Sequence, residues 1–282
     1  MTSTIAEEIS SGRRFEFGKN WLRFLNTLNA ERIGLARHSL QSMLGMDSLA
    51  GMSFIDVGSG SGLFSLAARQ LGARVRSFDY DPNSVSCTRI LYERFCTNDP
   101  DWIIEEGSVL DADYMQTLGT YDIVYSWGVL HHTGDLWKAL ANVGELVADN
   151  GLLFIAIYND QGGWSRRWRK LKLIYNKLPA GLRMPYLLLV MGIREFRSLL
   201  GSIISLHPLH YIQYWTRYAN QSGRGMSRWR DMVDWMGGYP FEVAKPEEIF
   251  RFYRELGFQL VELMTCGGGL GCNQYVFKRG GR

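Results

Sequence analysis

The amino-acid sequence predicts an α/β protein in which helices cover both faces of a seven-stranded, mostly parallel sheet. Short apolar runs bounded by turn-forming residues alternate with longer stretches of helical periodicity over most of the 282 residues. Such alternation is typical of a doubly wound parallel sheet. A hydrophobic content of 46% is enough to bury one large core, or one core and a smaller attachment. We therefore expect a globular protein built around a single sheet.

Seven apolar segments are expected to form the strands. The last two follow a helix expected over residues 245–258, whose first turn contains Pro246 and two acidic residues. Proline suits a first turn because the N–H group that it lacks would be unpaired there. By the same rule, Asp81 followed by Pro82 predicts an N-cap and the start of a helix after the second strand. The expected strands cover residues 52–57, 73–79, 102–106, 121–126, 151–158, 259–263 and 274–278.

Two regions outside this alternation are expected to be helical. Before the first strand, residues 20–45 are amphipathic and end at Gly45, which predicts one or two helices. After the fifth strand, residues 165–179 and 185–206 have a helical pattern, and residues 217–244 combine a helix with glycine-rich loops. The expected organisation is an N-terminal helical cap (1–50), a ligand-binding core (51–158), a helical lid insertion (159–244) and a C-terminal completion of the core (245–282).

The insertion differs from the rest of the chain in charge. Between Asp160 and Arg230 there are thirteen Lys or Arg residues against two acids, Asp160 and Glu195, a net charge of +11, whereas the remainder carries −8. One interpretation is a solvated helix face, because basic side chains often cover amphipathic helices. The near absence of acids favours another: a basic, aromatic lid for an anionic acceptor such as a carboxylate or phosphate, or for a membrane surface that carries a lipid-linked one.

Composition disfavours several classes of protein. The N-terminal residues lack the apolar centre of an export signal, and the longest apolar run, residues 184–193, is far shorter than the ~20 residues of a membrane span. The four cysteines show neither a Cys-x-x-Cys pair nor a Cys/His cluster at zinc spacing. We therefore expect a cytoplasmic protein with reduced thiols and no metal site, either a monomer or a homodimer.

A glycine-rich loop follows the first expected strand. Asp56 precedes three glycines at every second position, Gly58, Gly60 and Gly62, where the chain must turn into a helix. Glycine allows a positive φ and lets a ligand approach the backbone closely. The dinucleotide fingerprint G-x-G-x-x-G would require a third glycine at position 63, which is Leu63. The loop is therefore expected to bind a ligand at the carboxyl edge of the sheet, but not as a dinucleotide fingerprint.

Further motifs follow the next strands in order. Asp79 ends the second strand within S-F-D-Y-D-P, residues 105–111 read E-E-G-S-V-L-D, and residues 121–140 contain Y-S-W-G-V-L-H-H-T-G-D. Together with the glycine loop, these motifs resemble the class I S-adenosylmethionine-dependent methyltransferases, including small-molecule enzymes of quinone biosynthesis. The resemblance extends over residues 54–158 and 245–278. It implies a Rossmann-like core that binds S-adenosylmethionine.

The resemblance assigns the expected cofactor contacts residue by residue. It places Asp56 near the methionine amino group, with capping of the following helix as the alternative, and Asp79 on both ribose hydroxyls. The adenine contact is expected from Ser108 or, in its place, from the backbone of Val109 or from Asp111. The full expected set is Asp56, Gly58, Ser59, Gly60, Gly62, Asp79, Tyr80, Ser108, Val109, Ser126 and Trp127.

The candidates for the acceptor side follow the fourth and fifth strands. The L-H-H-T-G-D segment resembles that of plant-type O-methyltransferases, in which the first histidine is the general base, and this points to His131. A structural role is the alternative for a histidine beside an apolar run. The expected catalytic residues are His131, His132 and Asp160, and the expected acceptor contacts are Tyr158, Asn159, Arg166 and Tyr239.

The function that the resemblance implies is methyl transfer from S-adenosylmethionine to a small-molecule acceptor. A sulfonium methyl group is already activated, so the enzyme mainly has to align the acceptor, exclude water and remove a proton, without a metal. We expect O-methylation of an anionic sugar, lipid-linked compound or secondary metabolite. One alternative is an RNA or protein methyltransferase, although the fourth strand lacks the N/D-P-P-Y signature of base methylation and nucleic acid is not expected. Another is a catalytically inactive, cofactor-binding scaffold.

Overall fold

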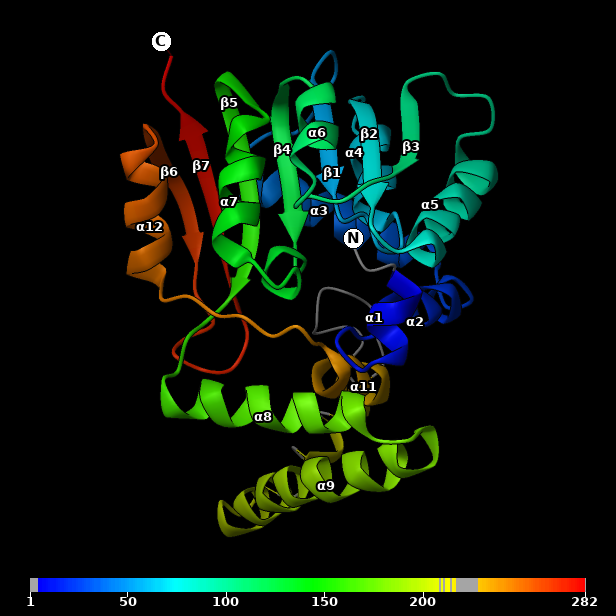
Figure 1. Cartoon of the computed structure of the whole chain (residues 1–282), viewed down its shortest axis with the longest axis vertical. Helices are drawn as coiled ribbons and strands as arrows, with labels where there is room; N and C mark the ends of the chain where they lie inside the picture. The colour runs from blue at the N-terminus through cyan, green and yellow to red at the C-terminus, as the bar shows by residue number, and fades with distance from the viewer. Residues whose placement is uncertain (1–4, 208, 210, 214, 217–227, 282) are drawn as a thin grey trace. The chain divides into compact units, whose positions relative to one another are not determined.

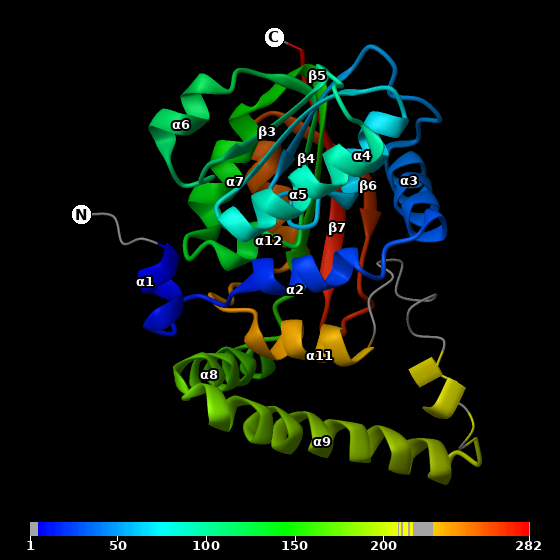
Figure 2. The same cartoon turned by 90° about the vertical axis from the view of Figure 1, so that its right-hand side faces the viewer.

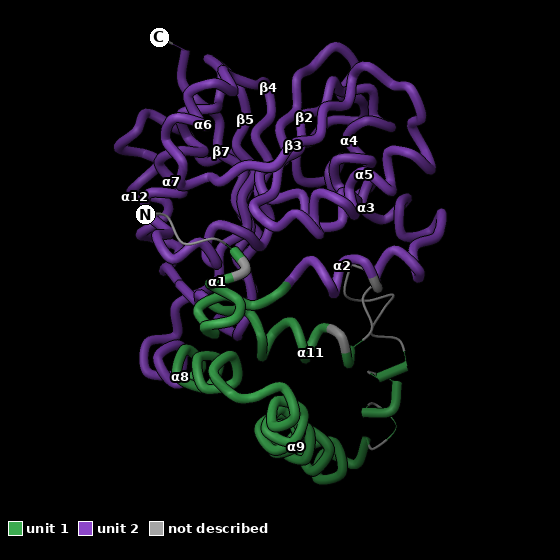
Figure 3. Tube along the Cα trace, turned by 45° about the vertical axis from the view of Figure 1, so that its right-hand side comes forward, with its two compact units in different colours: residues 1–16, 168–239 green, residues 17–167, 240–282 purple. Residues whose placement is uncertain are grey.

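The computed structural model describes residues 5–207, 209, 211–213, 215, 216 and 228–281 of the chain. These residues form two compact units, coloured separately in Figure 3: residues 17–167 with 240–282, and residues 1–16 with 168–239. We call the first the sheet unit and the second the helical unit. Arg217 and Arg224, which contribute to the charge of the insertion, lie outside the described residues.

The sheet unit contains seven strands in the order β3-β2-β1-β4-β5-β7-β6 (Figure 1). Strands β1 to β5 pair in parallel, and β7 runs antiparallel between β5 and β6. The predicted seven-stranded, mostly parallel sheet is confirmed. The strand order reverses between β1 and β4, and ligands of open α/β sheets bind at such a switch point. The strands are Ser53–Val57 (β1), Arg74–Asp79 (β2), Trp102–Glu106 (β3), Tyr121–Trp127 (β4), Val147–Tyr158 (β5), Phe258–Met264 (β6) and Cys272–Arg279 (β7).

Helices cover both faces of this sheet. In Figure 2, α6 and α7 lie on one side of the strands and α3 and α4 on the other. The predicted end of a helix at Gly45 is confirmed, because this glycine caps α3 with a φ of 66°. The helices of the sheet unit are Phe17–Leu25 (α2), Ala30–Leu44 (α3), Leu63–Gln70 (α4), Pro82–Phe95 (α5), Ala112–Thr117 (α6), Leu136–Glu145 (α7) and Pro246–Glu255 (α12), with a 3-10 turn at Leu130–His132.

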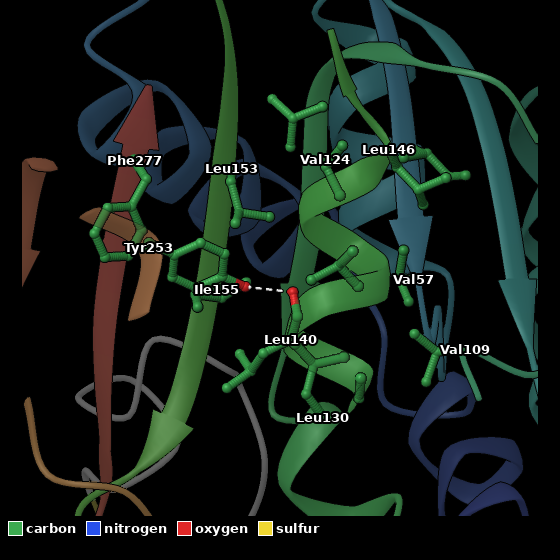
Figure 4. Close-up of a cluster of buried hydrophobic side chains, with 14 of the residues drawn as sticks. Val57, Val109, Val124, Leu130, Leu140, Leu146, Leu153, Ile155, Tyr253 and Phe277 are labelled. Carbon is green, nitrogen blue, oxygen red and sulfur yellow. Dashed lines mark hydrogen bonds between the residues drawn. The ribbon is translucent and has the colours of Figure 1, made fainter. Parts of the chain in front are cut away.

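The core between the sheet and helices α6, α7 and α12 is almost entirely apolar. Figure 4 shows Val124 and Ile155 of the central strands packed against Leu140 of α7, all three with no exposed surface. The phenol of Tyr253 is buried in the same cluster, where its hydroxyl donates to the carbonyl oxygen of Leu140 at 2.9 Å. This bond satisfies a polar group that would otherwise destabilise the core.

Helix α2 begins on the first turn of α5. The carboxylate of Asp81 caps α5 through the N–H of Asn83, as predicted, and its second oxygen accepts from the N–H of Gly18 at 2.9 Å. Gly18 has no room for a side chain there, because a Cβ atom would lie 2.5 Å from Cβ of Asn83 and 2.6 Å from Oδ2 of Asp81. One buried carboxylate therefore joins helix α2 to helix α5.

In the described part of the chain, the helical unit contains α1 (Ile5–Ser10), most of α8 (Gly163–Lys177), α9 (Ala180–Ile204) and α11 (Arg228–Gly237). Trp168 of α8 packs edge-on against Trp235 of α11, with ring centroids 5.5 Å apart. Lys172 is fully buried, bonds the carbonyl oxygen of Trp235 and lies 4.2 Å from the centroid of its ring. The two helices expected over residues 165–179 and 185–206 are present as α8 and α9. The second begins earlier than expected, and Pro185 lies inside it, where it removes one intrahelical bond of an early turn.

Alanine is expected to have opposite effects at two helical glycines, one in the contact between α2 and α5 and one on an open side of α3. Gly18→Ala should lower the free energy of unfolding by about 1–3 kcal/mol, because the new methyl group meets Asp81 and Asn83. Gly34→Ala, in the middle of α3 with nothing within 4 Å of the new Cβ, should raise it by about 0.5–1 kcal/mol. Urea unfolding of the two variants measures both, and a neutral Gly18→Ala would mean that α2 is not held in this contact.

Candidate functional site

The glycine loop after β1 takes the backbone conformation that its sequence predicts. Gly58, Gly60 and Gly62 have φ values of +81°, +56° and +78°, which are strained for residues with a side chain. A Cβ atom would also lie 2.4 Å from Val129 at Gly58 and 2.9 Å from Thr88 at Gly62. Conformation and space therefore both require glycine.

Helix α2 contributes a tryptophan to this loop that sequence reasoning missed. A Cβ atom at Gly60 would lie 3.0 Å from the indole Nε1 of Trp21. One helical turn earlier, the ring of Phe17 lies 5.0 Å from that of His132, in the 3-10 turn that follows β4. The i, i+4 spacing of two aromatic residues was the signal available in the sequence, but it does not say which surface they cover. Helix α2 thus spans from the glycine loop to the histidine pair.

Asp79 lies where β2 ends, next to the same loop. Its two carboxylate oxygens each accept from a backbone N–H at 2.9 Å, one from Gly60 and one from Asp81. These bonds orient the carboxylate. The following residue, Tyr80, is partly exposed. The structure therefore brings the predicted ribose contact against the predicted cofactor loop.

Asp56 is buried beneath the loop, at the end of a chain of polar side chains. The indole N–H of Trp102 donates to Oγ of Ser77, Ser77 donates to Oγ of Ser65, and Ser65 donates to the carboxylate of Asp56. Burial raises the pKa of Asp56 to about 7, while the Ser65 bond opposes this shift and the charge of Asp79 adds to it. Ser65 lies in the first turn of α4, whose N-cap residue is Gly62. Both the hydroxyl and the backbone N–H of Ser65 bond to Asp56, so this aspartate holds the first turn of the helix that follows the loop.

The residues of the turn after β3 form hydrogen bonds within the turn and to the neighbouring helices α6 and α7. Oγ of Ser108 accepts from the N–H of Leu110, and the carbonyl oxygen of Val109 accepts from the side chain of Asn142 at 2.6 Å. One oxygen of Asp111 accepts from two N–H groups in the first turn of α6, which makes this residue the N-cap of α6. The carboxylate of Asp111, one of the predicted adenine contacts, therefore already binds two backbone N–H groups of α6.

The two predicted cofactor residues at the end of β4 face different partners. Ser126 is fully buried, and its hydroxyl donates to the carbonyl oxygen of Val57 at 2.9 Å. The indole N–H of Trp127 donates to the side chain of Gln274 on β7 at 2.9 Å. Ser126 therefore links β4 to β1 at the switch point, whereas Trp127 links it to the antiparallel edge.

The histidine pair lies in an aromatic cluster. His131 has no exposed surface, and its ring lies 3.9 Å from that of Tyr158 and 4.5 Å from that of His132. Nδ1 of His132 lies 2.6 Å from the carbonyl oxygen of Pro240. A carbonyl oxygen only accepts, so Nδ1 carries a proton, which in the neutral form of the ring leaves Nε2 as the acceptor.

The other predicted acceptor residues are only partly brought together. The side chain of Asn159 accepts from that of Asn273 at 3.1 Å, and Oδ1 of Asp160 accepts from the N–H of Gly162 at 2.8 Å. Both residues follow Tyr158, whose ring lies in the histidine cluster. Arg166 is exposed on α8, and Tyr239 belongs to the helical unit, where its carbonyl oxygen accepts from the N–H of Phe15.

The geometry supports a ligand that is cationic at one end and rich in hydroxyl groups. Two carboxylates flank the glycine loop: Asp56 is buried beneath it, and Asp79 accepts from the N–H of Gly60. A positive group beside Asp56 would offset the cost of burying its charge, and the carboxylate of Asp79 can accept from neighbouring hydroxyls. The aromatic cluster at the end of β4 and β5 offers an apolar wall with one histidine of fixed tautomer.

Comparison with known proteins identifies one family and several relatives. Residues 28–186 match the model of a family described as a methyltransferase domain. A ubiquinone biosynthesis O-methyltransferase of Mesorhizobium japonicum is 25% identical over 142 residues, which cover 49% of this chain and 55% of the relative. The enzyme of the same name from Methylocella silvestris is 28% identical over 171 residues, covering 52% and 62%. The chain thus spans little more than half the length of these curated relatives.

Solved structures show the same fold at low sequence identity. An O-methyltransferase family protein from Burkholderia thailandensis is 12% identical, with a TM-score of 0.53 over 88% of this chain and 57% of that one. The magnesium protoporphyrin IX methyltransferase from Synechocystis, solved with bound S-adenosylhomocysteine, is 16% identical, with a TM-score of 0.50 over 89% and 88%. At these identities the likeness extends to the fold alone.

The buried carboxylate of Asp56 predicts a pH dependence of stability. In the unfolded chain its pKa is near the ordinary 3.8, and in the folded chain it is about 7. The folded state therefore holds a proton that the unfolded state loses, so this residue's contribution is full below pH 3.8 and falls as the pH rises to about 7. The loss amounts to about 4 kcal/mol at 1.4 kcal/mol per pKa unit.

Asp56→Asn removes this titration and retains an acceptor for Ser65. Urea unfolding without ligand at pH 5 and pH 8 should show that the substitution is more favourable at pH 8, because only the unmodified chain then carries the buried charge. If the substitution changed the free energy of unfolding equally at both pH values, burial would not raise the pKa of this carboxylate.

Proposed function

The chain belongs to the methyltransferase-domain family, and on that premise we propose that it is an S-adenosylmethionine-dependent enzyme that methylates an oxygen atom of a small-molecule acceptor. The curated relatives are named as O-methyltransferases of ubiquinone biosynthesis, which supports oxygen as the acceptor atom and a small molecule as its carrier. The observation that carries the proposal is the pairing of the glycine loop with Asp79 at the end of β2.

The residues of this edge fit S-adenosylmethionine. The glycines give this loop the positive φ values that its turn into α4 requires, and Val129, Trp21 and Thr88 pack against them where side chains would otherwise lie. We propose that Asp79 accepts from the ribose hydroxyls and that Asp56 offsets the positive charge of the methionine amino group. When bound, the cofactor supplies a methyl group activated by its positive sulfonium.

Further contacts to the cofactor are proposed from the neighbouring strand ends. The backbone of Val109 is better suited than Asp111 to the adenine, since the carboxylate of Asp111 already caps α6. Trp21, which touches Gly60, adds an aromatic surface that excludes water beside the loop. The other proposed contacts are those of the predicted set: Gly58, Ser59, Gly60, Gly62, Tyr80, Ser108, Ser126 and Trp127.

On the acceptor side, we propose that the histidine pair removes the hydroxyl proton. The sequence favours His131, whereas the structure supports His132, because Pro240 orients this ring and fixes its proton on Nδ1. An oriented base is the arrangement that general-base catalysis requires. Tyr158 contacts both rings and supplies the apolar wall against which an acceptor can be aligned.

The class of acceptor is proposed from charge. The insertion is strongly basic in sequence, and Arg166 at the start of α8 is exposed and follows Tyr158, Asn159 and Asp160 closely along the chain. These features support an acceptor with a carboxylate or phosphate, such as an acidic sugar, a lipid-linked compound or a secondary metabolite.

The function is tested by binding and turnover together. Calorimetry with S-adenosylhomocysteine should show one site per chain, and S-adenosylmethionine should be converted to S-adenosylhomocysteine when a phenolic or hydroxylated anionic acceptor is supplied. Asp79→Asn should weaken cofactor binding by about 2–4 kcal/mol, or some 30- to 1000-fold. Asp122→Asn is the matched control, because this carboxylate lies at the opposite end of the sheet, bound to Ser53, and should leave affinity unchanged.

Two outcomes distinguish the alternatives. Binding without turnover of any acceptor would favour an inactive, cofactor-binding scaffold. Equal cofactor affinity of Asp79→Asn and the unmodified chain would refute the ribose assignment.

The histidine proposal predicts a difference between two single substitutions. His132→Gln should lower kcat by about 10²–10⁴-fold with cofactor affinity preserved, because a positioned base contributes that factor. His131→Gln should lower the melting temperature and leave kcat of the folded enzyme nearly unchanged, since this ring is fully buried against Tyr158. Steady-state kinetics and thermal unfolding of both variants measure these effects. A loss of kcat in His131→Gln, with only a loss of stability in His132→Gln, would instead identify His131 as the base.

A further inference from the structure

Helix α9 has an apolar side that faces solvent along its whole length. Seven large hydrophobic residues on it are between 44% and 72% exposed. They recur at intervals of three, four and seven residues, which places them on one side of an α-helix. The residues of this apolar side are Leu182, Leu189, Ile193, Phe196, Leu200, Ile203 and Ile204.

The opposite side of α9 already holds the helix in its unit. Leu187 and Met191 are 0% and 2% exposed, and Glu195, one further turn along, pairs with Arg228 at 2.5 Å. The same carboxylate accepts from the hydroxyl of Tyr211 and the indole N–H of Trp215. The exposed apolar side therefore lies away from the contacts that fold the unit, and another partner has to account for it.

The charges beside this apolar side are positive. Arg194 and Arg197 are exposed on α9, whereas its acid, Glu195, is engaged by Arg228. On the preceding helix, Arg169 and Lys170 are exposed as well. An apolar strip bordered by arginines is the pattern of a helix that lies in a membrane interface, where the arginines meet lipid phosphates.

A spanning role does not fit α9. Among the described residues, no helix is long and apolar enough to cross a bilayer. A second copy of the chain is also a poor fit, because a two-fold contact through this side would bring the arginines of both copies together. Anionic lipid matches both properties of the surface. Its acyl region can bury the apolar side chains, and its headgroup phosphates can pair with Arg194 and Arg197.

We propose that α9 docks the protein on a membrane surface that contains anionic lipid. The apolar side of α9 enters the boundary between headgroups and acyl chains, and the arginines bind phosphates. This inference is independent of the proposed methyl transfer, because it involves only residues of the helical unit.

The experiment measures binding of the whole chain to sedimenting vesicles. Vesicles of phosphatidylcholine with phosphatidylglycerol should bind the chain, and vesicles of phosphatidylcholine alone should bind it more weakly. The double substitution Ile193→Ser with Phe196→Ser should reduce binding at least about tenfold, because two apolar side chains no longer leave water. Arg194→Gln with Arg197→Gln should remove most of the preference for anionic vesicles, at about fivefold per arginine.

A matched control lies on the same helix. Met184 and Leu188 are 47% and 54% exposed but lie outside the apolar side, so Met184→Ser with Leu188→Ser should change vesicle binding less than twofold. All variants should bind S-adenosylhomocysteine and unfold as the unmodified chain does, which separates docking from folding and from the cofactor site.

Three results would overturn the proposal. The first is no binding of the unmodified chain to anionic vesicles. The second is equal loss of binding in the two serine double variants. The third is a stable dimer in sedimentation velocity that Ile193→Ser with Phe196→Ser dissolves while vesicle binding is absent, which would make the apolar side a contact between two chains.

Discussion

The turn that leaves β1 is the constraint on which the candidate site depends. Three residues with positive φ let the chain reverse into α4 within a few positions, and the N–H of Gly60 is held by the carboxylate that ends β2. The loop and Asp79 therefore fix each other, so the carboxylate that we propose as the ribose contact is held in one orientation before a ligand binds. Such pre-organisation reduces the cost of binding.

The segment after β2 holds helix α2 beside the glycine loop. Asp81, two residues after Asp79, caps α5 and holds the first turn of α2 through Gly18. From that contact α2 runs past the glycine loop, where Trp21 lies, and presents Phe17 to His132. A short acidic segment after β2 thus positions both the loop and the helix that flanks it.

Most of the fold could be predicted because it depends on local patterns. The seven strands, the glycine loop, the Asp81 cap and the end of a helix at Gly45 each follow from residues within a few positions of one another, and the resemblance to methyltransferases is confirmed by the family match. The site could be predicted less fully. Trp21 touches a residue 39 positions later in the chain, and the Pro240 carbonyl that orients His132 is 108 positions away. Contacts of that kind leave no periodic signal in a single sequence. The role of Asp111 in capping α6 was likewise hidden, because a carboxylate in a turn suits a cap and a ligand contact equally.

Hydrogen exchange with and without S-adenosylhomocysteine is the most direct test that this edge of the sheet binds the cofactor. We predict slower exchange in the loop 58–62, at residues 79–81 and in the turn 107–111, because the ligand would cover their N–H groups and stabilise their bonds. The turns at Gly51 and Gly119, at the opposite end of the strands, should exchange at unchanged rates. Protection at those turns, or no protection in the glycine loop, would contradict the account.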